Sequence, residues 1–140
     1  MMVLKKIYLD IDGVLLTTKQ TKPADGSSTF IEFIIESFDC YWLTTHCKGD
    51  ARNAINYLAR YFEKPVLNML RHVKPTNWTT LKTEAIDFSH DFIWIEDYPF
   101  ESEKKVLLSY DRLDNLIIVD HNNKEELKRV MGILEKNLAI

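Results

Sequence analysis

Short apolar runs alternate with segments of helical periodicity along this chain, and this alternation restricts its fold more than any other feature. The runs that predict strands are residues 6–11, 40–43, 65–67, 92–95 and 116–119. The first, fourth and fifth runs are rich in β-branched or aromatic residues, which is typical of strands buried on both faces of a parallel sheet. The pattern therefore indicates strands that lie inside the protein.

The segments between these runs predict helices, at residues 29–38, 50–62, 79–86 and 101–109, with a last helix opening at residue 123. The first of them begins with Thr29 and Glu32, whose spacing fits a capping box. Strands that alternate with helices are joined by right-handed crossovers. We therefore expect an α/β fold, with a doubly wound, mostly parallel five-stranded sheet of the Rossmann-like type and helices on both faces.

Length, charge and cysteine content exclude several classes of protein. The 140 residues fit one domain, residues 1–140, and the net charge of −3 provides no overall basic field for nucleic acid. No run approaches the roughly 20 apolar residues that cross a bilayer. Asp10 and Asp12 interrupt the apolar N-terminal run, which argues against a signal peptide. Because Cys40 and Cys47 form no C-x-x-C pair, we expect a reduced, cytoplasmic protein with no membrane partner.

One polar segment, residues 17–28, interrupts the alternation directly after the first strand. Pro23 and the adjacent Asp25 and Gly26 are turn signals within it. Since it leaves the first strand, the segment is placed to cover the strand ends. We expect a small hairpin or flap over residues 17–28.

Polar side chains follow the predicted strands at the points where the strands end. Ligands of doubly wound sheets bind beyond the carboxyl ends of the strands, so these positions form the candidate site. They are Asp10, Asp12 and Gly13 after the first strand, Thr44 after the second, Lys82 in the helix predicted at 79–86, and Glu96 and Asp97 after the fourth strand.

This set of side chains suits phosphoryl transfer. Asp10 and Asp12 lie two residues apart on an extended segment and point to the same side. A third carboxylate from another strand completes an oxygen-rich site for Mg²⁺, without which the acids would repel one another. Gly13 lets the backbone approach a phosphate closely. Thr44 offers a hydroxyl group to a phosphate oxygen, and Lys82 offers positive charge to the developing transition state.

The same elements in the same order resemble the four motifs of the haloacid dehalogenase (HAD)-like hydrolase superfamily, over nearly the whole chain. The first motif, D-x-D-G-[VT]-[LV], is matched by residues 10–15. Its hydroxyl motif is matched by Thr44, its lysine motif by Lys82, and its acidic motif by Glu96 and Asp97. The resemblance implies the HAD fold and the activity of a small phosphatase.

The resemblance also implies roles for single residues. Asp10 attacks phosphorus and forms an aspartyl-phosphate, while Asp12 protonates the leaving oxygen and then activates water. Mg²⁺ is held by Asp10, by the backbone carbonyl of Asp12 and by Asp97. Two roles stay open for Glu96, as a metal ligand or as a residue that orients its neighbour.

Further residues near the motifs have alternative assignments. Thr45 competes with Thr44 for the hydroxyl role, and the position directly after the strand favours Thr44. His46 follows the same motif. Thr45, His46 and Gly13 are the candidates for substrate binding. Lys74, in the loop before Lys82, is the alternative phosphate-facing lysine.

The spacing of the motifs leaves no room for a cap domain. Only 31 residues, 13 to 43, separate Asp12 from Thr44, and 37 residues, 45 to 81, separate Thr44 from Lys82. We expect an open site screened only by the flap. An open site suits a bulky phosphorylated substrate, such as a nucleic-acid end or a phosphoprotein, or a cap supplied by a partner subunit.

Two other functions are compatible with clustered acids on an α/β fold. A phospho-accepting receiver domain carries its phosphorylated aspartate at the third strand, whereas the run at 65–67 is followed by none. A catalytically idle HAD-like module would bind a phosphorylated partner without turnover. Metal-dependent turnover separates that module from the enzyme.

Overall fold

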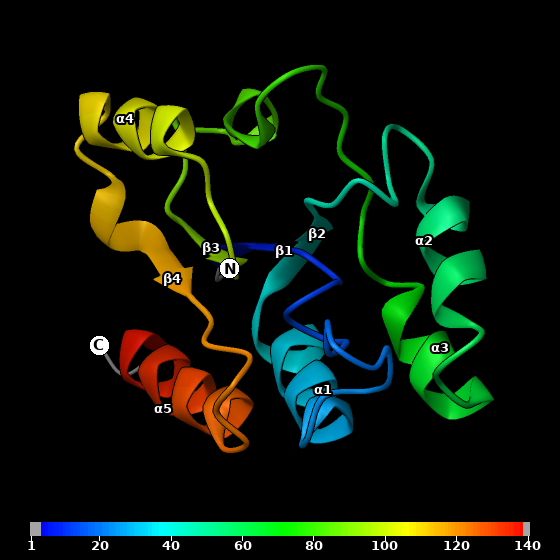
Figure 1. Ribbon diagram of the computed structural model, residues 1–140. Helices are drawn as coiled ribbons and strands as arrows, with labels where there is room; N and C mark the ends of the chain where they lie inside the picture. The colour runs from blue at the N-terminus through cyan, green and yellow to red at the C-terminus, as the bar shows by residue number, and fades with distance from the viewer. Residues whose placement is uncertain (1–3, 139–140) are drawn as a thin grey trace.

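A parallel sheet forms the centre of the protein in the computed structural model, which describes residues 4–138 (Figure 1). Within that range the strands are β1 (Lys6–Leu9), β2 (Asp39–Trp42), β3 (Phe92–Glu96) and β4 (Leu116–Ile118). Their order is β2-β1-β3-β4, and every neighbouring pair is parallel. The sheet confirms the predicted α/β class and places β1 in the interior of the sheet.

In the described part of the chain, five α-helices and two 3₁₀ turns connect and follow the strands. They are α1 (Ser27–Ser37), α2 (Ala51–Leu58), α3 (Lys64–Leu70), η1 (Lys82–Ala85), α4 (Glu101–Ser109), η2 (Leu113–Asn115) and α5 (Glu126–Leu138). The helices predicted at 29–38 and 101–109 and from residue 123 correspond to α1, α4 and α5. The helix predicted at 50–62 ends at Leu58, and the one predicted at 79–86 is reduced to the short turn η1.

The expected fifth strand at residues 65–67 is wrong, because these residues lie in α3. Pro65 occupies the first turn of that helix, where its missing N–H group and fixed φ favour helix initiation. The edge of β2 is instead contacted by a single parallel bridge between Tyr41 and Lys74. Lys74 donates its N–H to Cys40 at 2.9 Å, and its carbonyl accepts from Trp42 N at 2.8 Å. Among residues 4–138 the sheet therefore has four strands and one bridging residue.

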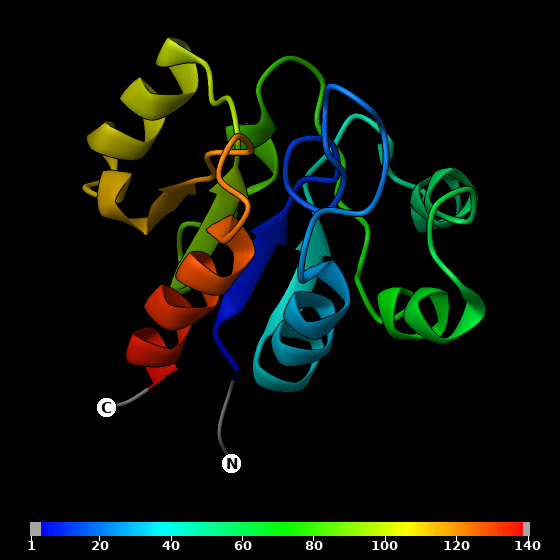
Figure 2. The ribbon, with the colours of Figure 1, turned by 60° about the horizontal axis from the view of Figure 1, so that its bottom comes forward.

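Helices cover both faces of the sheet, as predicted. Ile7 and Leu9 of β1 are fully buried on the face covered by α1 and α5, which cross the front of the sheet in Figure 2. Tyr8 points to the other face and packs with Trp94 of β3 and Leu107 of α4. Burial of each such side chain stabilises the fold by about 1.5–3 kcal/mol. The two apolar layers fix the strand ends in place.

The chain leaves the sheet at Asp10, whose N–H donates to Ile95 O at 3.3 Å. The carbonyl of Ile11 then accepts from the N–H groups of residues 14, 15 and 16, which closes a tight turn. A loop follows in which Leu16 bridges Pro23 in antiparallel fashion. Residues 17–26 of the predicted flap thus form a loop, while its last two residues, Ser27 and Ser28, belong to α1.

None of the described helices combines the length and the apolar character that a bilayer-spanning helix requires.

Candidate active site

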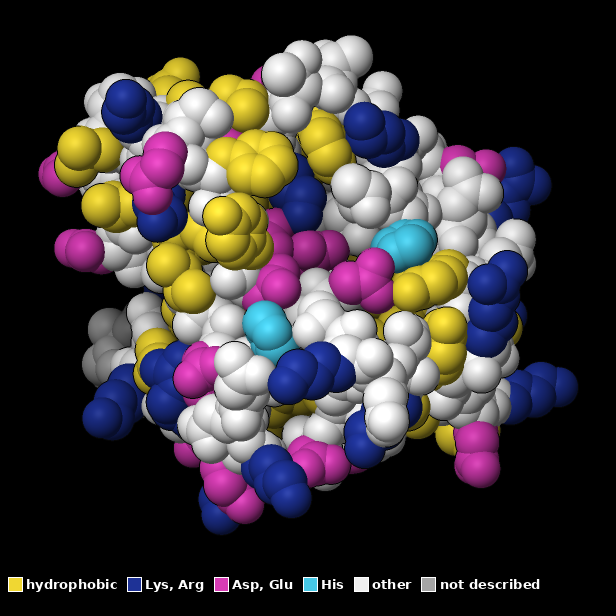
Figure 3. All heavy atoms as spheres, in the orientation of Figure 1, with side chains coloured by type: hydrophobic (Ala, Val, Ile, Leu, Met, Phe, Trp, Pro, Cys, Tyr) yellow, Lys and Arg dark blue, Asp and Glu magenta, His cyan; other side chains and the backbone are white. Residues whose placement is uncertain are grey.

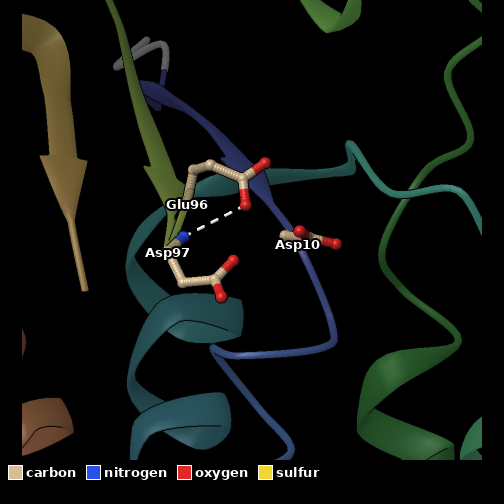
Figure 4. A group of neighbouring side chains, drawn as sticks. All are labelled: Asp10, Glu96 and Asp97. Atoms are coloured by element: carbon tan, nitrogen blue, oxygen red, sulfur yellow. Dashed lines mark hydrogen bonds between the residues drawn. The ribbon is translucent and has the colours of Figure 1, made fainter. Parts of the chain in front are cut away.

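Three carboxylates meet where β1 and β3 end, at Asp10, Glu96 and Asp97 (Figure 4). One oxygen from each lies within 4.8 Å of the others. The strands are parallel neighbours, so their carboxyl ends lie at the same edge of the sheet. The three side chains are mostly buried, with exposed fractions of 11%, 3% and 16%. Acidic side chains gather near the centre of the face shown in Figure 3.

Lys82 is the lysine that faces this cluster. Its Nζ lies 3.0 Å from Asp10 Oδ2 and 2.5 Å from Glu96 Oε1. Lys74, the alternative, instead pairs with Asp39 at 2.9 Å beside β2. The structure therefore brings Lys82 to the acids and leaves Lys74 at the edge of the sheet.

Two glutamates hold the loop that carries Lys82. The buried Glu103 of α4 accepts the Lys82 N–H at 2.8 Å and, with its other oxygen, the Phe100 N–H at 2.8 Å. Glu84 accepts from the backbone N–H groups of residues 79, 80 and 81. These hydrogen bonds hold the pKa of Glu84 at about 2, led by the one from Leu81. Lys82 is thus placed by the backbone as well as by its ion pairs.

The charges of the cluster are coupled. Burial, followed by the charge of Asp10, raises the pKa of Glu96 well above that of an exposed glutamate. Burial also opposes the charge on Lys82, but the attraction of Asp10 and Glu96 outweighs it and raises the pKa of the lysine. At neutral pH Lys82 is therefore cationic, and the raised pKa of Glu96 favours its protonated form. A divalent cation binding to these oxygens would displace that proton.

Glu96 and Asp97 differ in how their oxygens are used. Glu96 Oε1 accepts from Lys82, and Oε2 accepts from the N–H groups of Asp97 at 3.0 Å and Tyr98 at 3.4 Å. Within residues 4–138 no hydrogen bond reaches the Asp97 carboxylate, and the basic side chain that lies within 4 Å of it is His121, whose Nδ1 is 3.9 Å from Asp97 Oδ2. The Asp97 carboxylate is the less engaged of the two and hence the better placed to bind a cation.

Asp12 does not join the carboxylate cluster. Its Oδ2 lies 2.8 Å from His46 Nε2, and its Oδ1 accepts from Tyr57 Oη at 2.9 Å. The rings of His46 and Tyr57 stack with centroids 3.7 Å apart. Burial, followed by the hydrogen bond to Asp12, raises the pKa of Tyr57 to about 12, so its hydroxyl group stays protonated and donates. Both oxygens of Asp12 are held while the carboxylate stays 46% exposed.

The loop after β2 presents Thr44 and its neighbours on the other side of Asp10's strand. Thr44 is fully buried, and its Oγ1 accepts the His46 N–H at 3.3 Å. Thr45 is exposed, as the next residue of the loop. The hydroxyl group that the fold buries at the strand end is therefore that of Thr44.

Gly13 lies against the acid cluster. Its φ of +82° is in the left-handed region, and an added Cβ would stand 2.1 Å from Asp97 Oδ2. Only glycine fits both the conformation and the contact. The glycine of the D-x-D-G sequence thus lets the backbone approach the carboxylate that is free to bind a cation.

Sequence reasoning missed two residues of this site. Tyr57 is a partly buried residue of α2 that packs against the core, and nothing in its spacing signals a bond to Asp12. Glu103 stands three residues after Phe100, which is not a capping residue type, so no capping box was indicated.

The three carboxylates fit a hard cation such as Mg²⁺. They bring buried oxygens together, and the Asp97 carboxylate has no hydrogen-bond partner in the described chain. No protein-family model matches this chain, and no curated protein matches it significantly. The chemistry of the site therefore rests on its geometry.

Proposed function

We propose that this protein is a Mg²⁺-dependent phosphomonoester hydrolase of the HAD type that uses Asp10 as a covalent nucleophile. The observation that carries the proposal is the meeting of Asp10, Asp97 and Lys82 at the end of an interior parallel strand. One buried carboxylate lies beside a cation and a second carboxylate that can hold a metal. This arrangement neutralises an incoming phosphate and leaves a nucleophile facing it.

The proposed reaction has two displacements at phosphorus. An Asp10 carboxylate oxygen forms a bond to phosphorus while the ester P–O bond breaks, and Asp12 gives a proton to the leaving oxygen. Asp12 then takes a proton from water, which attacks phosphorus and breaks the bond to Asp10. Bound Mg²⁺, held by Asp10, the Asp12 carbonyl and Asp97, would supply positive charge to the phosphoryl oxygens.

The hydrogen bonds of Asp12 support its role as the proton carrier. An acid that serves a leaving group has to keep one orientation through both steps. His46 and Tyr57 each bind one of its oxygens, so the carboxylate cannot rotate freely. Its 46% exposure keeps it within reach of a leaving group and of water.

Three other groups are assigned to the phosphate. Lys82 supplies a fixed positive charge on the nucleophile's side. Thr44 offers a hydroxyl group from the neighbouring strand end, and the backbone at Gly13 offers close approach. Thr45 and His46 follow Thr44 in the loop after β2 and are the further candidates for substrate contact. In this scheme His46 acts through Asp12.

The substrate that suits this site is bulky. Between Gly13 and Thr44 the chain forms one loop, α1 and β2, and between Thr44 and Lys82 it forms α2, α3 and their connections. A phosphorylated macromolecule, such as a nucleic-acid end or a phosphoprotein, could therefore reach the cluster.

The test is a phosphatase panel with and without Mg²⁺, run on the wild type and on Asp10→Asn. The panel spans an aryl phosphate, nucleotides, sugar phosphates, phosphopeptides and phosphorylated oligonucleotides. We expect turnover that requires both Mg²⁺ and Asp10. Turnover by Asp10→Asn at the wild-type rate would remove Asp10 as nucleophile. A blank panel in both proteins would favour a catalytically idle module that binds a phosphorylated partner.

A further inference from the structure

A cavity of about 410 Å³ opens beside the acid cluster. Its walls are the loop after β1 and the loop between β4 and α5, which lie at the carboxyl end of the sheet (Figure 2). Gly13 and His121 both line it, and both adjoin Asp97. The cavity therefore begins next to the neighbours of Asp97, which is a proposed metal ligand.

The cavity has an apolar floor and a cationic rim. The floor is formed by buried side chains, Val14, Leu16, Val119 and Leu127. The cationic rim consists of Lys19, Lys22 and Lys124, all exposed. Within residues 4–138 none of these three lysines forms an ion pair, although the protein is acidic overall with a net charge of −3. Positive charge without partners thus gathers at one edge of the acid cluster.

Two carboxylates also line the cavity, and one of them is already neutralised. Glu126 binds Arg129 at 2.7 Å and accepts the N–H of Asp120. Burial opposes its charge, but these bonds, led by the one from Arg129, lower its pKa. Asp25 remains as the single unneutralised acid against the three lysines of the cationic rim. The balance of charge at the cavity is positive.

We propose that this cavity binds a second phosphate carried by the leaving group of the substrate. The inference rests on the proposed function, because it takes the acid cluster as the place where the first phosphate reacts. The cationic rim attracts the second phosphate, and the floor accepts the apolar face of the sugar or base between the two. The preferred substrate is therefore a bisphosphate or a nucleic-acid terminus, rather than an isolated monophosphate.

The kinetic test compares matched monophosphates and bisphosphates. The pairs are adenosine 3′-phosphate with adenosine 3′,5′-bisphosphate, and glucose 6-phosphate with glucose 1,6-bisphosphate, with p-nitrophenyl phosphate as the reference. At low salt we expect kcat/KM to be about tenfold higher for the bisphosphate of at least one pair, chiefly through a lower KM, given the modest strength of exposed ion pairs. The preference should weaken as salt is raised, because salt screens exposed charges.

The double variant Lys22→Ala/Lys124→Ala tests the cationic rim. We expect it to lose the preference for the bisphosphate while hydrolysing p-nitrophenyl phosphate within about twofold of the wild-type rate. The matched control is Lys64→Ala/Lys136→Ala, which removes the same charge from exposed positions outside the cavity. An equal loss on all substrates, or an equal effect of the control, would overturn the proposal.

A binding measurement separates this proposal from the proposed function. Calorimetry on the Asp10→Asn variant in Mg²⁺, with the same adenosine mono- and bisphosphate, reports affinity without turnover. Tighter binding of the bisphosphate that depends on Lys22 and Lys124 supports the cavity even if no substrate is turned over. Equal affinities for the two compounds would reject the cavity even if the phosphatase activity is established.

Discussion

Replacing Tyr57 with phenylalanine removes one hydroxyl group from Asp12, the residue assigned as general acid and base. The ring that stacks on His46 at 3.7 Å is retained, so the change is confined to the 2.9 Å hydrogen bond to Oδ1. A hydrogen bond to a charged group contributes about 1.5–3 kcal/mol. Asp12 is 46% exposed, so we take the lower end. About 1.5 kcal/mol corresponds to roughly a tenfold change in rate.

The assay compares leaving groups. An alkyl phosphate needs its leaving oxygen protonated, whereas p-nitrophenolate leaves without help. We expect Tyr57→Phe to lower kcat/KM for an alkyl phosphate about tenfold and to leave kcat/KM for p-nitrophenyl phosphate nearly unaffected, because kcat/KM reports the step in which the leaving group departs and not the later attack of water. The control is Tyr61→Phe, whose ring meets Tyr57 edge-on without bonding to Asp12. An equal loss on both substrates would mean that Tyr57 serves the fold, and wild-type kinetics on both would refute the positioning of Asp12.

Three further changes test other parts of the account. Gly13→Ala should lower kcat about 100-fold, since a Cβ 2.1 Å from Asp97 Oδ2 forces that carboxylate to move; activity within threefold of wild type would contradict this. Lys82→Met should destabilise the metal-free protein by about 3 kcal/mol, roughly 10 °C in Tm, because buried carboxylates lose their cation; calorimetry should show Mg²⁺ restoring part of the loss. Hydrogen bonds lower the pKa of Glu84 from 4.5 to about 2, so its charge adds stability above pH 4.5 that is lost as the pH falls toward 2. In acid unfolding, the wild type should be more stable than Glu84→Gln above pH 4.5, and this difference should vanish by about pH 2.

The fold class was predictable because it depends on local patterns. Runs such as 92–95 are long and β-branched enough to indicate a strand, and the alternation with helices leaves few topologies. The run at 65–67 was misread because a three-residue apolar run carries no periodicity. Pro65 was the signal that favoured a helix start there. The sheet contact made at Lys74 has no such local signature.

The acid cluster was predictable because topology alone places it. Asp10 and Asp97 follow strands that turn out to be parallel neighbours, so their meeting needs no knowledge of side-chain packing. The orientation of Asp12 could not be predicted in this way. It depends on where α2 packs, since Tyr57 lies 45 residues further along the chain. Long-range packing of that kind leaves no trace in the spacing of residues.

The most direct test of the account is to trap the covalent state on Asp10. The protein is mixed with substrate and Mg²⁺, quenched in acid within one turnover, and treated with borohydride, which reduces an acyl phosphate to an alcohol. Peptide mass spectrometry then locates the modified residue. We predict homoserine at position 10, only when Mg²⁺ and substrate are both present. Turnover that proceeds with Asp10 unmodified in every quenched sample would contradict the covalent mechanism.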